Sequence, residues 1–248
     1  MALYNDILDN NDLENRQEKI PFSEKYSFAI IIGCGGTGSW VGLNLALCGR
    51  IENLVLIDPD IIEQSNLNRT PYRLCDVGKN KAEALKYIIL ERRLIDIYSH
   101  PIQTNKDFSI ALLRDIKQKS IDDFDESTME DDVVIIDCRD DIYDDFYNWN
   151  CKYYKLGYDG CSITLDGNPQ NTPVWGSTTG YQVTPSFLCP PQLLANLVVN
   201  DICIDITNNA DEKYKDYYCD EAGRLNDVIT IDTQYLMRKL YFLSKKEN

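Results

Sequence analysis

A glycine-rich run directly after an apolar stretch is the part of the chain best suited to chemistry. Residues 33–38 read GCGGTG, which matches the spacing G-x-G-x-x-G, and they follow the apolar run 28–32. Glycines let the backbone turn tightly and approach a phosphate closely, and the helix that follows offers free N–H groups and the positive end of its dipole. We therefore expect a phosphate-bearing ligand to bind at Gly33, Gly35, Gly36 and Gly38.

An acidic residue stands where a nucleotide ribose would need it. The second apolar run, residues 54–57, ends at Asp58, which lies 20 residues beyond Gly38. A carboxylate at this place accepts hydrogen bonds from both hydroxyls of a ribose, so the combined pattern predicts an adenine nucleotide. NAD, FAD and ATP all present adenosine and phosphates, and the pattern does not choose among them. The alternative is a glycine turn that serves only tight helix packing.

Three residues further along the chain favour ATP. They are Asn66, Arg69 and Lys81. Phosphoryl-group chemistry needs fixed positive charge around phosphorus, whereas a dehydrogenase needs no cationic pair here. Arg69 can fork onto phosphate oxygens, Lys81 supplies a point charge from a helix N-terminus, and Asn66 can donate an amide hydrogen. A dehydrogenase would leave all three unexplained.

Residues 65–69, SNLNR, resemble the signature of the ThiF/MoeB/HesA family, which includes the ubiquitin-activating enzymes. Two later motifs are similar to family motifs in the same order: Gly78-x-x-Lys81, and DCRD at residues 137–140. The resemblance covers roughly residues 25–205. It implies a Rossmann-like fold and transfer of AMP from ATP to the C-terminal carboxylate of a ubiquitin-like or sulfur-carrier protein or a peptide.

The resemblance also implies roles for single residues. It assigns the ribose to Asp58, the phosphates to Asn66 and Arg69, the phosphates and developing charge to Lys81, and Mg²⁺ to Asp140. Asp140 follows the apolar run 133–136, so it is expected at the carboxyl edge of a parallel sheet, where such sites form. A hard oxygen ligand there suits Mg²⁺ that bridges phosphates.

An N-terminal motif concerns assembly. Family members are commonly dimers in which the arginine of an Asn-Arg-Gln sequence enters the partner's ATP site. Residues 15–17 are similar, so the resemblance implies a homodimer and a catalytic role for Arg16. The motif lies closer to the glycine turn than in typical members. The alternative is one charge on a solvated arm.

The chain also departs from the family pattern. Thr70 replaces the usual glutamine after the motif arginine, Asp141 stands where asparagine is common, and the paired CxxC motifs of zinc-bearing members are missing. Residues 167–182, which correspond to the crossover loop of thioester-forming relatives, contain no cysteine, although Cys161 and Cys189 flank them. We therefore expect the acyl-adenylate to be passed on without an enzyme thioester.

The elements that must position these residues follow from hydrophobic patterning. Continuous apolar runs suit strands that helices cover on both faces, and alternation with helical patterns gives right-handed βαβ units. We expect strands at 28–32, 54–57, 133–136, 153–158, 161–165, 172–177 and 228–231, and helices at 37–48, 81–94, 185–206 and 233–243. The predicted class is α/β, with a Rossmann-like, mostly parallel sheet, additional strands and a C-terminal helix. We expect an N-terminal arm at 1–24 and one adenylation domain at 25–248.

Composition narrows the remaining choices. The 248 residues carry a net charge of -15, the wrong sign for sequence-independent binding to nucleic acid or an anionic membrane. Nine scattered cysteines and one histidine favour neither disulfides nor a zinc site, and no apolar run of signal-peptide length is present, so a cytoplasmic location is expected. Two alternative functions stay open: a catalytically idle subunit of a two-part activating enzyme, and an activator of a small-molecule or tRNA carboxylate.

Overall fold

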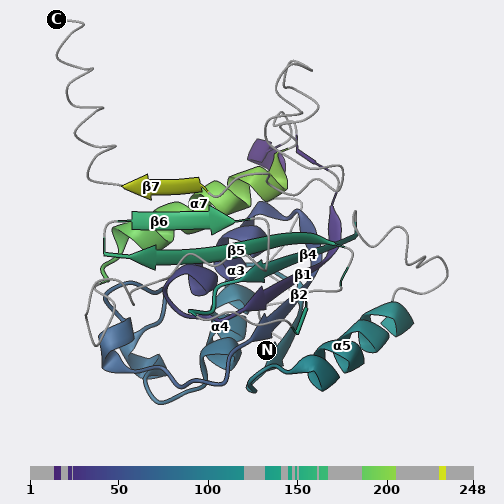
Figure 1. Ribbon diagram of the computed structural model, residues 1–248, viewed down its shortest axis with the longest axis horizontal. Helices are drawn as coiled ribbons and strands as arrows, with labels where there is room; N and C mark the ends of the chain where they lie inside the picture. Colours follow the sequence, from purple (N-terminus) through teal and green to yellow (C-terminus); the bar gives the residue numbers. More distant parts are fainter. Residues whose placement is uncertain are drawn as a thin grey trace, which may run out of the picture.

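A seven-stranded sheet forms the centre of the computed structural model, which describes residues 14–17, 22–23, 25–119, 132–140, 145–146, 149, 151–160, 162–166, 186–204 and 229–232. The strands are β1 Tyr26–Ile32, β2 Ile51–Ile57, β3 Asp96–His100, β4 Val133–Asp137, β5 Lys152–Asp159, β6 Ser162–Asp166 and β7 Ile229–Asp232. Their spatial order is β3-β2-β1-β4-β5-β6-β7 (Figure 1). The first five pair in parallel and the last two are antiparallel, which confirms the expected Rossmann-like α/β class.

Helices cover both faces of the sheet. The α-helices are α3 Gly36–Cys48, α4 Lys81–Leu90, α5 Lys106–Lys119 and α7 Cys189–Cys203, and three short 3-10 helices are η1 Asn15–Gln17, η2 Gln64–Asn66 and η3 Leu74–Asp76. Buried residues of α3, α4 and α7 belong to one apolar cluster, and those of α5 to a second on the opposite face. Figure 1 shows α5 apart from the other three helices.

The strand β1 explains why the sequence shows continuous apolar runs. Ala29 and Ile31 join the cluster under α3 and α4, whereas Phe28, Ile30 and Ile32 join the cluster under α5. Successive side chains of a strand point to opposite faces, so a strand covered on both faces must be apolar at every position. Both clusters gain stability because this apolar area leaves water.

Several boundaries differ from the expectations. The helix expected at 81–94 ends at Leu90, and the one expected at 185–206 is shorter and spans Cys189–Cys203. The edge strand β3 and the helix α5 were not expected. The predicted strand 172–177 and the predicted helix 233–243 lie outside the described residues. The described part contains no helix long and apolar enough to cross a membrane.

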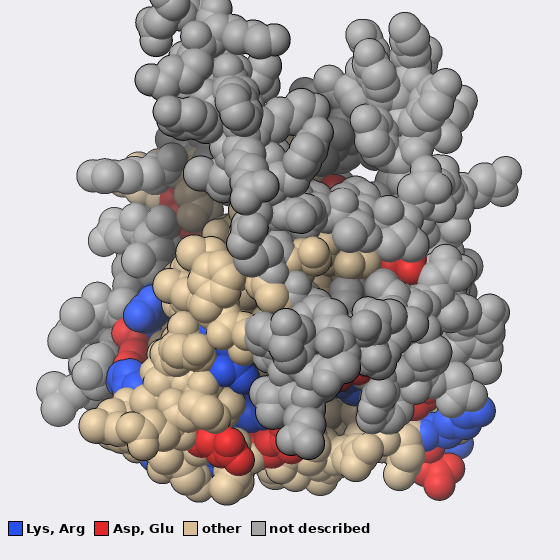
Figure 2. Space-filling model, turned by 60° about the vertical axis from the view of Figure 1, so that its left-hand side comes forward, with Lys and Arg blue, Asp and Glu red and all other residues tan. Residues whose placement is uncertain are grey.

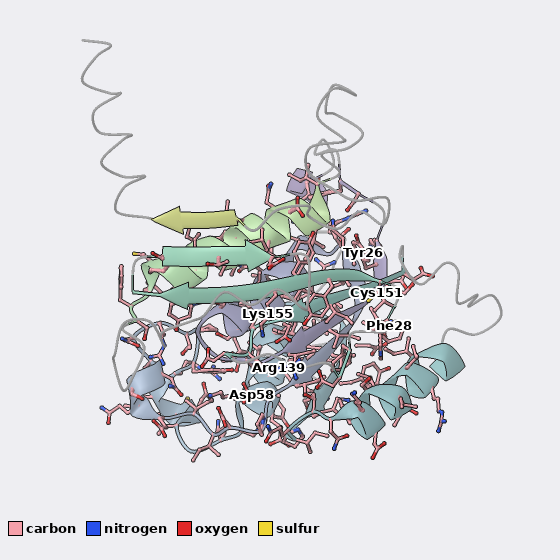
Figure 3. All side chains as sticks on the ribbon, viewed as in Figure 1. Tyr26, Phe28, Asp58, Arg139, Cys151 and Lys155 are labelled. Carbon is pink, nitrogen blue, oxygen red and sulfur yellow. The ribbon has the colours of Figure 1, made fainter. Side chains whose placement is uncertain are left out.

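The sheet order gathers the predicted site at one edge. In parallel strands all carboxyl ends lie at the same edge, so the loops after β1, β2, β4 and β5 converge there. Figure 3 shows Asp58, Arg139 and Lys155 towards this edge, with Tyr26 and Phe28 towards the opposite one.

Candidate active site

The glycines of the turn between β1 and α3 are required for different physical reasons. Gly33 has a φ of 87°, a left-handed value that side chains disfavour, and its N–H donates to the Ile57 carbonyl at 2.8 Å. A Cβ on Gly38 would stand 1.8 Å from the Gly33 carbonyl oxygen, so only glycine lets α3 begin this close to β1. A Cβ on Gly35 would meet no atom within 4 Å. This open space is where a ligand can approach the backbone.

A cavity of about 390 Å³ lies at the carboxyl edge of the sheet, beside this turn. Its walls come from the loops after β1, β2, β3 and β4, from the start of α4 and from residues 156–158 of β5. Figure 2 brings this edge forward and shows basic and acidic side chains close together on it. The predicted site residues that line the cavity are Gly33, Gly35, Gly36, Asp58, Asn66, Arg69, Lys81 and Asp140. Gly38 lies behind the turn, where it serves packing.

Asp58 follows β2 directly and is 4% exposed. Its carboxylate accepts hydrogen bonds from the N–H of Cys34 at 2.6 Å and from the N–H of Asp60 at 2.8 Å. Burial raises the pKa of Asp58, while the charge of Lys81 and the two N–H groups oppose that shift. The carboxylate thus ties the glycine turn to the end of β2. Each of its oxygens keeps a lone pair with which it could accept a ribose hydroxyl.

The segment after Asp58 presents an amide and a guanidinium to the cavity. The amide oxygen of Asn66 accepts from the N–H of Glu63 at 3.0 Å, so its amide N–H₂ is the group that can donate to a ligand. Arg69 Nε donates to the Tyr158 hydroxyl at 3.1 Å, and Nη1 donates to the Ser65 carbonyl at 2.8 Å. Within the described residues the hydrogen bonds of this guanidinium use Nε and Nη1 and leave Nη2 for an anion.

Lys81 is the first residue of α4. The side chain of Asn80 caps this helix by accepting from the N–H of Glu83 at 3.1 Å. This cap fixes the start of the helix at Lys81. Lys81 Nζ pairs with Asp60 Oδ2 at 2.7 Å, although Asp60 is largely exposed. A surface partner of this kind binds weakly and can be exchanged for a phosphate. Tyr72, which the sequence did not point to, donates to the carbonyls of Cys34 and Lys81 and joins turn and helix.

The loop before α4 is held by Asp76, which is 1% exposed. Its Oδ2 accepts from Arg73 Nε at 3.0 Å and its Oδ1 accepts from Lys79 Nζ at 2.8 Å. Burial by itself would raise the pKa of Asp76, but these hydrogen bonds outweigh it and lower the pKa to about 2. Because this value lies below the usual carboxyl pKa near ~3.9, the ionised form stabilises the fold at neutral pH.

Replacing Asp76 by Ala should therefore destabilise the protein in a pH-dependent way. We expect a loss on the order of 1–3 kcal/mol in the free energy of unfolding at pH 7, because the hydrogen bonds of Arg73 and Lys79 to a charged carboxylate are lost. The stabilising effect of a lowered carboxyl pKa is present above pH ~4 and fades as pH falls towards ~2, so parent and variant should converge there. Urea unfolding at several pH values measures this. Asp115→Ala, which removes an exposed carboxylate, is the matched control, and an equal loss in both variants would contradict the role of Asp76.

Asp140 is exposed and lines the cavity three residues past the end of β4. Within the described ranges, no group of three or more histidine, cysteine or acidic side chains could hold a metal ion by itself. An exposed carboxylate at the cavity is a group that suits Mg²⁺, which binds through one or two carboxylates, waters and substrate phosphates. Below Asp140 lies a buried cluster of charged residues that the sequence did not reveal, formed by Asp137, Arg139, Asp145 and Lys155.

The structure does not bring every predicted residue to the cavity. Arg16 lies in η1, and its side chain is outside the described residues. Glu14, just before η1, pairs with Arg93, and both contact the position of Gly49 at the far end of α3. The start of η1 is therefore about one helix length from the glycine turn. Cys161 lies outside the described residues, and Cys189 is exposed at the start of α7.

Comparison with known proteins supports the expected kinship. The model of the ThiF family matches residues 13–149. The NEDD8-activating enzyme E1 catalytic subunits of Arabidopsis thaliana and Dictyostelium discoideum are 46% and 47% identical to this chain over 68 and 64 residues. Those segments cover 27% and 25% of this chain, but they span only 15% and 14% of the length of the relatives.

Solved structures agree at the level of the fold. PaaA superposes with a TM-score of 0.57 at 22% identity, over 92% of this chain and 72% of its own. Escherichia coli MccB, solved with ATP, superposes with a TM-score of 0.54 at 23% identity, over 91% of this chain and 64% of its own. The family model covers more than half of the residues, and the chain belongs to the ThiF family.

Proposed function

We propose that this protein is an ATP-dependent adenylyltransferase that activates the C-terminal carboxylate of a ubiquitin-like or sulfur-carrier protein or of a peptide. One observation carries the proposal: Arg69, Lys81 and Asp140 come from separate segments and line the same cavity as the glycine turn and Asp58. A nucleotide-binding turn alone would serve many reactions. Fixed cations together with a carboxylate suit the transfer of a charged phosphorus group.

In the proposed reaction a carboxylate oxygen of the acceptor attacks the α-phosphorus of ATP. The bond from this phosphorus to the bridging oxygen of pyrophosphate breaks, which yields an acyl-adenylate and free pyrophosphate. Arg69 offers its Nη2 side to phosphate oxygens, and Asn66 donates an amide hydrogen. Lys81 would leave its weak surface partner Asp60 and stabilise negative charge as it builds up. Asp58 would hold the ribose.

Asp140 is the residue proposed to bind Mg²⁺. Asp140 would hold the ion, whose positive charge would offset the charge of the departing pyrophosphate. An exposed carboxylate at the cavity fits this part because the nucleotide and water supply the remaining ligands.

The two thiols beside the turn, Cys34 and Cys138, are unsuited to forming a thioester. Burial raises the pKa of Cys34, and the nearby carboxylate of Asp58 raises it further. Burial raises the pKa of Cys138 as well, beside the charge of Asp137. Neither thiol therefore forms a thiolate nucleophile at neutral pH. We propose that the adenylate passes to a nucleophile from another molecule.

The position of η1 bears on how the protein assembles. The anchoring of Glu14 at the far end of α3 sets η1 apart from the cavity of its own chain. A catalytic role for Arg16 would then need the cavity of a second copy, so we propose a homodimer in which Arg16 acts in trans. The arm 1–24 would serve this contact, and 25–248 would form the adenylation domain. An idle subunit would have little need to keep cations and a carboxylate around one cavity, and this favours the active form.

Nucleotide choice tests the proposal first. We expect ATP to bind in the presence of Mg²⁺, NAD to show no measurable binding, and chelation of Mg²⁺ to weaken ATP binding by about tenfold or more, as the loss of a metal bridge implies. Isothermal titration calorimetry of the full chain with each nucleotide measures this. Tight binding of NAD without binding of ATP would sink the proposal.

A further inference from the structure

Lys155 is a lysine in an unusual place. It lies inside β5 and is 1% exposed, between Tyr154 and Leu156, which are both buried. Lysine is almost never fully buried unless it is paired, because removing an ammonium group from water is costly. In the register of the sheet it stands opposite Asp137, the last residue of β4, and the two charges lie 3.3 Å apart.

This pair belongs to a balanced group of four charges. Arg139 donates to both carboxylate oxygens of Asp137, at 2.9 and 2.6 Å, and to both of Asp145, at 2.8 and 3.0 Å. Tyr153 adds a hydrogen bond from its hydroxyl to Asp137 Oδ2 at 2.8 Å. Two lysine or arginine charges thus face two carboxylates. Such a group seldom stabilises a fold more than apolar side chains of equal volume would, so its presence calls for another reason.

The contacts of Lys155 indicate that reason. Its Nζ donates to the backbone carbonyl of Arg139 at 2.7 Å, and Asp137 Oδ1 accepts from the backbone N–H of Arg139 at 3.0 Å. The backbone of Arg139 is therefore held on both sides. The peptide that Lys155 grips joins Arg139 to Asp140, whose side chain lines the cavity. Fixing this peptide removes the freedom of the backbone just before the carboxylate.

We propose that Lys155 is a positioning residue, which holds the peptide between Arg139 and Asp140 so that the Asp140 carboxylate meets Mg²⁺–ATP in one orientation. The inference rests on the proposed function, because it needs Asp140 to act on the metal. Lys155 itself does not line the cavity and acts only through the loop. Partners that orient a metal ligand in this way typically change metal affinity by about 10–100-fold when they are lost.

Lys155→Met is the direct test, because methionine keeps the length of the stem and removes the donor. Lys152→Met is the matched control: it changes the same residue type in the same strand, at the end away from the cavity, where Lys152 lies 3.7 Å from Asp201. ATP affinity is measured by calorimetry with Mg²⁺ and with chelator. We expect Mg²⁺ to raise the ATP affinity of Lys152→Met as much as that of the parent. In Lys155→Met the increase caused by Mg²⁺ should be about tenfold smaller.

A double-mutant cycle shows whether Lys155 acts through Asp140. If it does, Lys155→Met causes no further loss in an Asp140→Ala background. A role in stability alone would lower the melting temperature and the active fraction but leave the Mg²⁺-dependent gain unchanged. An unchanged gain in Lys155→Met, or equal losses with and without the Asp140 carboxylate, would overturn the proposal.

A second readout needs no ligand. Hydrogen exchange of the Arg139 amide, whose N–H bonds to Asp137, should become about tenfold faster or more in Lys155→Met, equivalent to ~1.4 kcal/mol of lost protection. If Mg²⁺ does not raise the ATP affinity of the parent protein, the proposed function fails. Unchanged hydrogen exchange of the Arg139 amide in Lys155→Met would separately refute the proposal that Lys155 holds this peptide. If Lys155→Met does not fold, the double variant Lys155→Met/Asp137→Asn, which removes one charge of each sign, is compared with Asp137→Asn alone in the same assays.

Discussion

Replacing Arg69 or Lys81 by alanine should each lower acceptor-dependent exchange of pyrophosphate into ATP by about a hundredfold or more, since the loss of one preorganised donor costs on the order of 3 kcal/mol in the transition state. Melting temperatures should hardly change. Arg69 bonds to Ser65 and Tyr158 at the rim of the cavity, and Lys81 pairs only with the exposed Asp60 among the contacts described above. Exchange assays with purified variants and a panel of carrier proteins and peptides measure this.

A matched control separates local chemistry from a general loss of charge. Arg92→Ala removes one exposed positive charge just after α4, outside the residues that line the cavity. This variant should exchange at the parent rate. Parent-like rates in both Arg69→Ala and Lys81→Ala, or an equal loss in Arg92→Ala, would show that the assigned roles are wrong.

Two glycines of the same turn should respond to alanine in opposite ways. In Gly38→Ala the new Cβ would stand 1.8 Å from the Gly33 carbonyl oxygen, and backbone cannot yield there as a side chain could. We expect the free energy of unfolding to fall by about 3 kcal/mol or more, the upper range for overpacking. Urea unfolding followed by circular dichroism measures this loss.

Gly35→Ala places its Cβ in open space, with no atom within 4 Å. Its loss of stability should therefore be at least ~2 kcal/mol smaller than that of Gly38→Ala. The added methyl group fills the room through which phosphates reach the backbone, so ATP affinity should fall by about tenfold or more, or ~1.4 kcal/mol. A stable Gly38→Ala, or a Gly35→Ala variant that binds ATP normally, would contradict this account of the turn.

Much of the fold could be predicted because its strands are buried on both faces. Residues 28–32 and 54–57 are continuous apolar runs for that reason, and the glycine turn marks where the first helix begins. The edge strand β3 could not be predicted from a continuous apolar run, because only Ile97 of its five residues is buried. The helix α5 does carry sequence signals: Asn105 caps it, and Leu112 and Ile116 stand four residues apart on its buried side.

The candidate site could be predicted only where its residues form local motifs. Asp58, Arg69 and Lys81 each belong to a short signature, and the sheet order then brings them to one cavity. Tyr158 and Lys155 could not be found in this way, because their partners are far away in sequence and are chosen by strand register. A lysine between two large residues, Tyr154 and Leu156, was an available signal, and it marks the buried charge cluster.

Acceptor-dependent exchange of radiolabelled pyrophosphate into ATP tests the central claim most directly. We expect exchange to require ATP, Mg²⁺ and an acceptor with a free C-terminal carboxylate, and the same acceptor with an amidated C-terminus to support none. Exchange that proceeds equally well with the amidated acceptor, or release of inorganic phosphate in place of pyrophosphate, would contradict adenylation of a carboxylate.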